Sequence, residues 1–377
     1  MNPNWETWRE QFPITRNYNF QNHAAVCPLS KRAADAGREY FTLAEQHAYV
    51  HQGFFRRVEQ IRQSAARLIN AQPDEIAFIK NTSEGISFVA NGLSWTSGDN
   101  VVLANVEFPA NVYPWQALQS RGVQMRMVLE EDGRIPIEQV MSAINSRTRV
   151  VAVSSVQYAS GYRTDLATLG EYCQSKGVFL CVDAIQSLGA FPIDVKGMNI
   201  DFLAADGHKW LLGPEGAGLF YVRRELQGYL RPTTIGWLSV RNAFDFGRNQ
   251  FEFKDSAARY ESGSYNLAGT FALGAAIDLA LEIGIENISR RLIRLTDRLA
   301  AGVVEKGYRV VSSRRPTEAS AIVAFVSDTH DPKQIQAHLQ SEHRIIIAER
   351  SGRLRASPHY YNTEREIDQL VETLPRH

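Results

Sequence analysis

The chain has 377 residues, of which 44% are hydrophobic and 22% charged, and these values are typical of a globular protein. Its 41 Lys and Arg balance its 41 Asp and Glu, and the resulting net charge of zero argues against nucleic acid as the main partner. No apolar run reaches the length of about 18 residues that a membrane span needs, and the first residues lack a signal-peptide pattern. The three cysteines, Cys27, Cys173 and Cys181, have neither disulfide nor metal-ligand spacing, so we expect a cytoplasmic protein without a metal.

Seven short apolar runs predict the strands of one large sheet. They lie at residues 77–79, 101–104, 125–128, 150–153, 178–182, 202–204 and 217–222. Uninterrupted runs of this length are typical of strands buried on both faces, and helical patterns between several of them predict parallel crossovers. The turn sequence Gly213-Pro214-Glu215-Gly216 between the last two runs indicates a hairpin, which would make one strand antiparallel. The pattern therefore predicts an α/β domain with a mostly parallel, seven-stranded sheet.

The pattern changes near residue 260. A long amphipathic stretch at 270–304 predicts a helix, and short apolar runs follow at 309–311, 321–326 and 345–347. We therefore expect a large domain over residues 21–260 and a smaller α+β domain over residues 261–377. The N-terminal segment, residues 1–20, contains a short helix that could pack on either domain.

Ligands of open α/β sheets bind beyond the carboxyl ends of the strands, so the residues that follow each run are candidates for a site. Thr82 and Ser83 begin a helix after the first run, where hydroxyls, free N–H groups and the helix dipole favour an anion. An ordinary helix cap is the alternative reading. Phe108, after the second run, is suited to stacking on a flat ligand, although a core phenylalanine would give the same pattern.

The later strand ends carry an acid and a lysine. Asp183 directly follows a buried run, where a carboxylate is costly unless it has a partner such as a ring N–H⁺, and Gln186 could reach the same ligand. The alternative is an Asp that caps the next helix. Lys209 follows another buried run and precedes Trp210-Leu211-Leu212, and a desolvated lysine has a lowered pKa and can act as an amine nucleophile. An anion site, a stacking ring, an acid and a lysine are together what pyridoxal phosphate (PLP) requires.

With Asp183-Ala184-Ile185-Gln186 and Gly207-His208-Lys209-Trp210, the sequence resembles the class V aminotransferase family of fold-type I PLP enzymes. That family includes cysteine desulfurases, isopenicillin-N epimerase-like proteins and kynureninases. The resemblance begins near Tyr18 and extends to Thr363. It implies the fold-type I architecture, PLP held as a Schiff base on Lys209, a small-molecule amino-acid substrate and a homodimer.

The resemblance also implies a role for each matching residue. Lys209 and Asp183 would be catalytic, the latter holding the pyridine nitrogen protonated. The residues expected to bind the cofactor are Thr82, Ser83, Phe108, Asp183, Gln186, His208 and Lys209, with Trp237 and Ser264 reaching the phosphate across a dimer interface. The residues expected to bind the substrate are Arg355, Gln157 and Asn22.

Three departures from the family pattern matter. The segment 348–354 before Arg355 reads as a short loop without a cysteine, whereas desulfurases of this type carry their persulfide cysteine there, so we disfavour a desulfurase. Asp206 stands where relatives often have a phosphate-binding serine, and because a carboxylate repels phosphate we do not expect it to be a ligand. Arg353 would face the same side of an extended strand as Arg355, but Arg355 directly precedes Ala356-Ser357-Pro358, as in the family.

The sequence leaves the reaction open. An aminotransferase comes first by resemblance, and an amino-acid epimerase or β-lyase follows. A PLP-binding sensor or scaffold without catalysis is the alternative from a different class. A nucleotide-binding enzyme is disfavoured because neither a dinucleotide-binding glycine motif nor a phosphate loop occurs.

Overall fold

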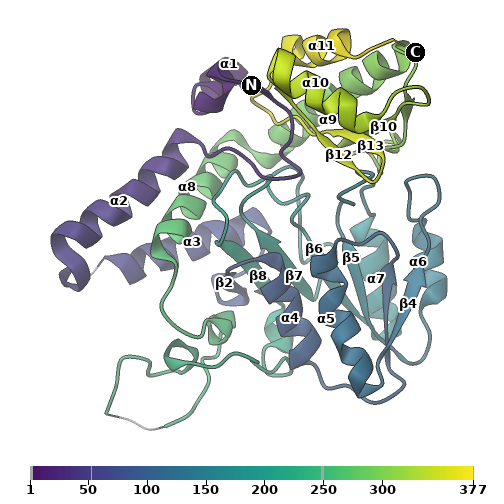
Figure 1. Cartoon of the computed structure of the whole chain (residues 1–377). Helices are drawn as coiled ribbons and strands as arrows, with labels where there is room; N and C mark the ends of the chain where they lie inside the picture. Colours follow the sequence, from purple (N-terminus) through teal and green to yellow (C-terminus); the bar gives the residue numbers. More distant parts are fainter. Residues whose placement is uncertain (1–2, 52, 248–249, 377) are drawn as a thin grey trace.

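The computed structural model describes residues 3–51, 53–247 and 250–376. Its centre is a seven-stranded sheet in which all seven predicted strands are confirmed (Figure 1). In spatial order the strands are β2 (Ile76–Ile79), β8 (Gly218–Val222), β7 (Phe202–Asp206), β6 (Phe179–Asp183), β5 (Thr148–Ser154), β3 (Asn100–Ala104) and β4 (Gln124–Val128). Only β8 runs antiparallel to its neighbours, as the hairpin after β7 predicted.

Both faces of the inner strands of this sheet are covered, which explains why those strands are apolar without alternation, whereas the edge strand β4 is largely exposed. In β5, Val150 and Ala152 pack in the same cluster as Phe88 of one helical layer, whereas Val151 and Val153 belong to the cluster on the opposite face. The helices that connect the strands are α4 (Thr82–Gly92), α5 (Tyr113–Gln116), α6 (Ile137–Ala143) and α7 (Leu166–Lys176). The sheet is therefore the middle layer of three, and its carboxyl-terminal edge is left open for a ligand.

The expected single helix over 270–304 is wrong in one respect. The structure has two helices there, α8 (Leu267–Ile283) and α9 (Ile285–Glu305), separated by Gly284 at φ 87°. A side chain is rarely tolerated at that angle, whereas glycine adopts it freely, so the chain turns between the two helices. Helix α8 packs against α2 (Lys31–His47) and α3 (Phe54–Leu68). Among the described residues no single helix suffices to cross a membrane, and α8 and α9 meet that criterion only jointly, across an 81° bend.

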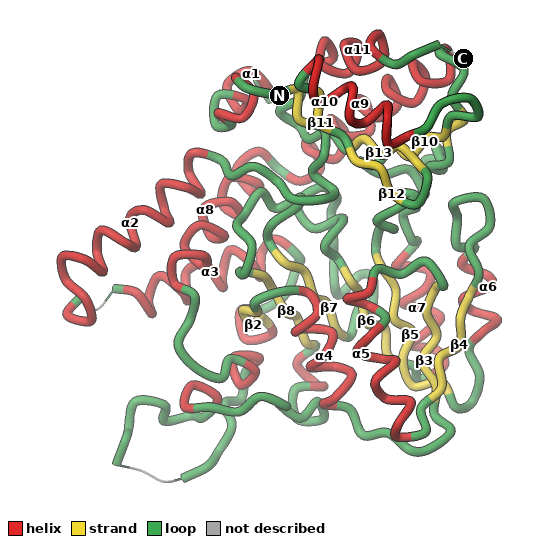
Figure 2. The backbone as a smooth tube through the Cα atoms, viewed as in Figure 1, coloured by secondary structure: helices red, strands yellow, loops and turns green. Residues whose placement is uncertain are grey.

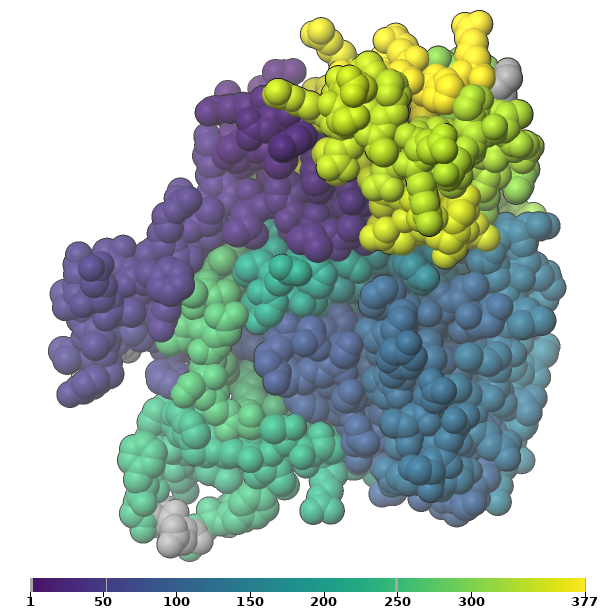
Figure 3. All heavy atoms as spheres, in the orientation of Figure 1, coloured from purple at the N-terminus to yellow at the C-terminus, as the bar shows by residue number. Residues whose placement is uncertain are grey.

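The C-terminal part contains a second, antiparallel sheet of four strands. Its order is β12 (Ala348–Arg350), β13 (Arg353–Ala356), β10 (Val323–Val326) and β9 (Arg309–Val310). Helices α9, α10 (Pro332–His343) and α11 (Glu364–Thr373) supply its remaining layer. This part lies over the edge of the large sheet, as the tube and the space-filling view show (Figures 2 and 3).

Two segments differ from the expectation. Residues 348–354 are not a loop, because β12 and β13 pair as a hairpin around the two-residue turn Ser351-Gly352. The run at 345–347 contributes β11 (Ile345–Ile346), which does not join the four-stranded sheet but pairs in parallel with β1 (Asn19–Phe20). The N-terminal segment is thereby tied to the C-terminal part.

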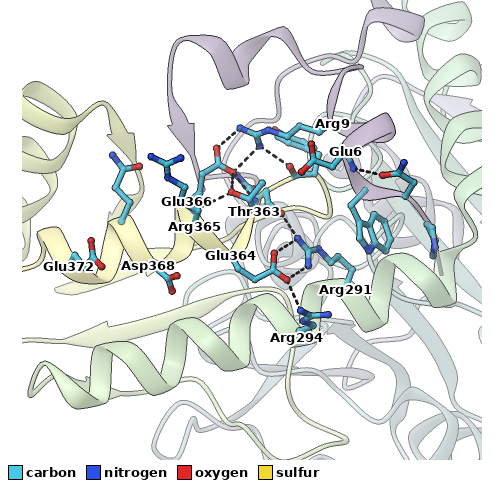
Figure 4. Close-up of a pocket in the computed structure, with 16 residues that line it drawn as sticks. Glu6, Arg9, Arg291, Arg294, Thr363, Glu364, Arg365, Glu366, Asp368 and Glu372 are labelled. Carbon is cyan, nitrogen blue, oxygen red and sulfur yellow. Dashed lines mark hydrogen bonds and ion pairs between the residues drawn. The ribbon is translucent and has the colours of Figure 1, made fainter.

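Helix α1 (Trp5–Arg9) strengthens this connection (Figure 4). The Arg9 guanidinium donates two hydrogen bonds of 2.8 Å to the carboxylate of Glu366 and a third to the Tyr361 carbonyl. Arg291 of α9 pairs in the same way with Glu364. These side chains line a wide polar hollow, in which Arg9, Arg291 and Arg294 already bind carboxylates of the chain itself.

Candidate active site

A cavity of about 350 Å³ lies beyond the carboxyl ends of β6 and β7, and residues 24–26 and the β12–β13 hairpin border its other side. Eight of the residues expected at a site line it together: Thr82, Ser83, Phe108, Asp183, Gln186, His208, Lys209 and Arg355. They come from five places in the sequence. The parallel arrangement of β2, β6 and β7 explains the gathering, because their carboxyl ends meet at one edge of the sheet.

The start of α4 forms the anion side of the cavity. Asn81 caps this helix by accepting the Glu84 N–H at 2.9 Å, so Thr82 and Ser83 are not needed as caps. Their hydroxyls and the unpaired N–H groups of the first turn remain for a ligand, and the helix dipole adds positive potential. The plain helix-cap reading of Thr82 and Ser83 is therefore wrong.

Asp206 is oriented by its own neighbours. One of its oxygens accepts the Gly207 N–H at 2.7 Å, and the other lies 2.9 Å from Nδ1 of His208. Its backbone N–H donates to the Thr82 hydroxyl oxygen at 3.1 Å. Asp206 therefore contacts both Thr82 and His208, which line the cavity with it.

Lys209 is 7% exposed, and its Nζ lies 5.5 Å from the centre of the Phe108 ring. Burial lowers the pKa of its amine to about 8, although the nearby Asp183 opposes the shift. No carboxylate of the described residues lies within 4.0 Å of this amine. Phe108 is 42% exposed, which excludes a core role and leaves its ring face available at the cavity.

Asp183 is the last residue of β6 and is fully buried. Oδ1 accepts the Ile185 N–H at 3.0 Å, and burial raises the pKa of the carboxyl group to about 7. It does not cap a helix of the described chain, contrary to the alternative reading. A buried acid of this kind is stabilised as a carboxylate by a cationic ring N–H⁺.

A hydrogen-bonded layer supports the floor of the cavity. Gln186 donates to the Ala24 carbonyl at 3.0 Å and accepts from the Trp210 indole at 2.8 Å, so the protein itself fixes this amide. Glu107, which sequence reasoning did not single out, accepts hydrogen bonds from Ser154, Asn111 and Gln157. Burial raises the pKa of Glu107, and its charge in turn raises that of Asp183.

Arg355 is buried at 1% exposure, yet no carboxylate of the described residues pairs with it. Its Nη1 donates to the Tyr158 carbonyl at 2.6 Å, and its buried Nε has no partner. Burial and the charge of Arg350 lower the pKa of the guanidinium to about 9. Arg353 instead pairs with Glu130 at 2.9 Å. Since a buried cation requires an anion, Arg355 rather than Arg353 is the candidate for binding a carboxylate.

Four expected site residues lie outside the cavity. Gln157 is buried and bonded to Glu107, with its Oε1 unpaired. Asn22 precedes the lining residues Ala24 and Ala25, and its Oδ1 is likewise buried without a partner. Trp237 and Ser264 lie in the connection between β8 and α8, away from the cavity of their own chain.

Sequence reasoning missed two residues that do line the cavity. Tyr158 places its ring 5.2 Å from that of Phe108 in an edge-to-face arrangement. Arg350 enters from the end of β12. The alternation of arginines at 353 and 355 was visible, but only a hairpin with a two-residue turn brings residue 350 to the same face.

Residues 19–370 match the model of the family described as aminotransferase class-V. The chain belongs to the class V aminotransferase family. A probable cysteine desulfurase of Methanothermobacter thermautotrophicus is 34% identical over 98% of this chain and 97% of its own length. The uncharacterized aminotransferase YcbU of Bacillus subtilis is 28% identical over the same shares.

Solved structures agree on the fold. The apo cysteine desulfurase of Thermococcus onnurineus superposes with a TM-score of 0.90 at 28% identity, covering 97% of this chain and 96% of that one. A mutant of C-DES with glycine covalently linked to its PLP cofactor gives 0.89 at 25% identity, over 97% and 98% of the two chains. The class V aminotransferase chain therefore has the fold-type I architecture of PLP enzymes.

The donor set of the cavity fits PLP. The hydroxyls and N–H groups at the start of α4 suit a phosphate, and the face of Phe108 suits an aromatic ring. Asp183 suits a pyridinium N–H⁺, and the Lys209 amine suits an aldehyde. Among the described residues neither the Lys209 amine nor the Arg355 guanidinium pairs with a carboxylate, and these are the groups that an aldehyde and a substrate carboxylate would engage.

Proposed function

We propose that this chain is a PLP-dependent enzyme that acts on the α-carbon of a small amino acid, in the first place as an aminotransferase. The observation that carries the proposal is the pair formed by Lys209 and Arg355. A buried amine and a buried guanidinium without a carboxylate share one cavity, together with an anion site for the cofactor. When bound, PLP supplies an aldehyde that joins amines and a ring that withdraws electrons from the α-carbon.

Lys209 has two tasks in this proposal. With a pKa of about 8, a sizeable part of its amine is neutral at mildly alkaline pH and can bond the cofactor aldehyde. With the cofactor and a substrate bound, the same amine would be placed to take the α-proton and to return it. Lys209 is therefore the catalytic base.

Asp183, Thr82, Ser83 and Phe108 position the cofactor. The Asp183 carboxylate keeps a proton on the ring nitrogen, and this positive ring strengthens electron withdrawal from the α-carbon. The first turn of α4 binds the phosphate. Phe108 covers one face of the ring, which excludes water and fixes its plane.

Arg355 binds the α-carboxylate of the substrate. A guanidinium donates two parallel N–H hydrogen bonds to the oxygens of a carboxylate, and the substrate then supplies the counter-charge that the described residues lack. Because Arg355 is held by the Tyr158 carbonyl at 2.6 Å, its direction is set before the substrate arrives. The α-carbon is thereby presented to Lys209.

A second candidate is elimination at a carbon–sulfur bond, which the similarity to cysteine desulfurases favours. Transfer of sulfur to a protein thiol is a poorer fit. Cys27, Cys173 and Cys181 are all buried, and burial raises the pKa of each thiol, which keeps it protonated and unreactive. The hairpin beside Arg355 has the tight turn Ser351-Gly352 and no cysteine.

We also propose that the enzyme works as a homodimer in the cytoplasm. The described part of the connection between β8 and α8 extends away from the large sheet (Figure 1). The aromatic rings of Trp237, Phe244 and Phe246 in this connection are exposed. Exposed apolar patches of this kind are typical of interfaces. A second copy that covered the patch would also be the route by which Trp237 and Ser264 reach a phosphate.

Borohydride reduction of the PLP-loaded protein, followed by peptide mass spectrometry, tests the cofactor site. We expect the label on Lys209, and Lys209→Ala should lose both the label and turnover. Product analysis with alanine, aspartate and cysteine then separates the reactions. A keto acid whose formation requires an acceptor keto acid supports transamination, whereas pyruvate with sulfide from cysteine supports elimination. A labelled protein that turns over no amino acid would contradict the proposal and favour a PLP-binding sensor.

A further inference from the structure

Arg350 enters the same cavity as Arg355, and no role for it follows from the reaction described above. We propose that Arg350 binds a second anionic group of the substrate, so that the site selects amino acids with a short, negatively charged side chain. This inference rests on the proposed function and names the substrate class of that site.

The register of the β12–β13 hairpin places three arginines on one face. Arg350 pairs across the hairpin with Arg353, and Ala348 pairs with Arg355. Residues directly opposite each other on antiparallel strands point to the same face, and so do residues two apart along a strand. Arg350, Arg353 and Arg355 therefore face the same side, toward the segments after β4 and β5 that carry Glu130 and Tyr158.

Only one of the three is neutralised by the described part of the chain. Arg353 pairs with Glu130 at 2.9 Å, whereas neither Arg350 nor Arg355 has a carboxylate within 4.0 Å among the described residues. The carboxylate of the nearby Glu349 instead accepts the Gly352 N–H at 2.7 Å, and the exposed Arg350 donates from Nη1 to the backbone carbonyl of Glu349 at 2.7 Å. Two positive charges thus remain at one cavity.

These two charges repel each other in the absence of ligand. The charge of Arg350 is among the causes that lower the pKa of Arg355, and it also lowers that of Lys209. One α-carboxylate relieves one guanidinium and leaves the other uncompensated. A substrate with two anionic groups relieves both, and electrostatic complementarity of this kind provides specificity.

The size of the cavity limits the distance between the two anions. Its volume of about 350 Å³ is at the lower end of ligand pockets, and the cofactor has to occupy part of it. The side chain must therefore be short, with its carboxylate or sulfinate on the first or second carbon beyond the α-carbon. Longer dianionic amino acids and neutral ones of equal size are the substrates to compare.

The test compares aspartate with asparagine, which differ in charge but hardly in shape, in the PLP-loaded enzyme and in variants of one hairpin. We expect kcat/KM to be at least tenfold higher for aspartate, and Arg350→Gln should reduce this ratio by about tenfold. Arg350→Lys should retain part of the preference. Arg353→Gln, which removes a neighbouring arginine already paired with Glu130, is the matched control and should leave the ratio unchanged.

A binding measurement without turnover completes the test. Dicarboxylates such as maleate should raise the melting temperature of the loaded enzyme more than acetate does, and Arg350→Glu should abolish that difference. Equal kcat/KM for aspartate and asparagine, or an aspartate preference that Arg350→Gln leaves intact, would overturn the inference while the proposed function stands. If no amino acid alters the cofactor absorbance or is turned over, both fail.

Discussion

The amine of Lys209 lies 5.5 Å from the centre of the Phe108 ring, across the cavity in which the cofactor is proposed to bind. A ring that joins Lys209 and rests on Asp183 would have to lie against the exposed face of Phe108. A cofactor ring in this position would explain why Phe108 is 42% exposed in the chain, although one edge of its ring contacts Tyr158.

Removing this aromatic face should weaken cofactor binding. Phe108→Leu loses stacking of about 1 kcal/mol, so the dissociation constant of PLP should rise by about fivefold. Equilibrium dialysis, with PLP detected by its absorbance, measures the dissociation constant. Tyr113→Leu, which removes another exposed aromatic a short distance along the chain, is the control. Equal retention of PLP by both variants would contradict the stacking role.

The lowered pKa of Lys209 predicts how cofactor binding depends on pH. Only the neutral amine attacks an aldehyde, so association of PLP with the apo protein should accelerate with rising pH and level off above about pH 8. With an ordinary lysine the association rate would continue to rise until the pH reached its usual pKa near 10.4. Because Asp183 raises the pKa of Lys209, Asp183→Asn should shift the midpoint to lower pH. Stopped-flow absorbance measures it, and a shift to higher pH would refute the coupling.

The buried Asp183 should make the apo protein less stable as pH rises. Its pKa is raised from 3.8 to about 7, so the folded state keeps the proton while the unfolded state loses it, and stability falls between about pH 4 and pH 7. Asp183→Asn should remove this fall. At pH 8 it should raise the free energy of unfolding by an amount on the order of a few kcal/mol, and the melting temperature should rise accordingly. Asp194→Asn is a control of opposite sign, because N–H groups lower the pKa of Asp194 and its charge stabilises the fold above that pKa.

Truncating Arg355 should lower catalytic efficiency only for substrates that carry a carboxylate. Arg355→Ala should reduce kcat/KM for alanine by at least about a hundredfold, corresponding to roughly 3 kcal/mol for a buried charged hydrogen bond. Transfer from ethylamine, which has no carboxylate, should change little. Steady-state kinetics on both amines provide the comparison, and a parallel loss for the two would show that Arg355 supports the fold rather than the substrate.

Glu107 should matter for stability as well as for the site. Glu107→Ala leaves the buried donors of Ser154, Asn111 and Gln157 unpaired, and we expect a loss of about 3 kcal/mol in urea unfolding. Glu171→Ala, on the exposed surface of α7, should stay within about 0.5 kcal/mol. A small effect of Glu107→Ala would show that water replaces the carboxylate.

The amino-acid sequence alone determined the strands of the large sheet, because strands buried on both faces are apolar throughout and stand out from the helices around them; the largely exposed edge strand β4 is the exception to this rule. It also determined which residues follow those strands, and so Thr82, Asp183 and Lys209 were correctly expected at one edge. Asn22, Gln157, Trp237 and Ser264 were expected from resemblance, and in the single chain none of them lines the cavity.

Only the tertiary structure decided the charge balance of the site. Sequence spacing shows that Arg350, Arg353 and Arg355 are close, but which guanidinium meets a carboxylate depends on strand pairing and on Glu130, more than two hundred residues away in the chain. The sequence likewise did not predict the break between α8 and α9 at Gly284 or the pairing of β1 with β11. Local patterns record what each segment buries, whereas the partner of a buried charge is chosen by contacts between segments that the sequence does not place side by side.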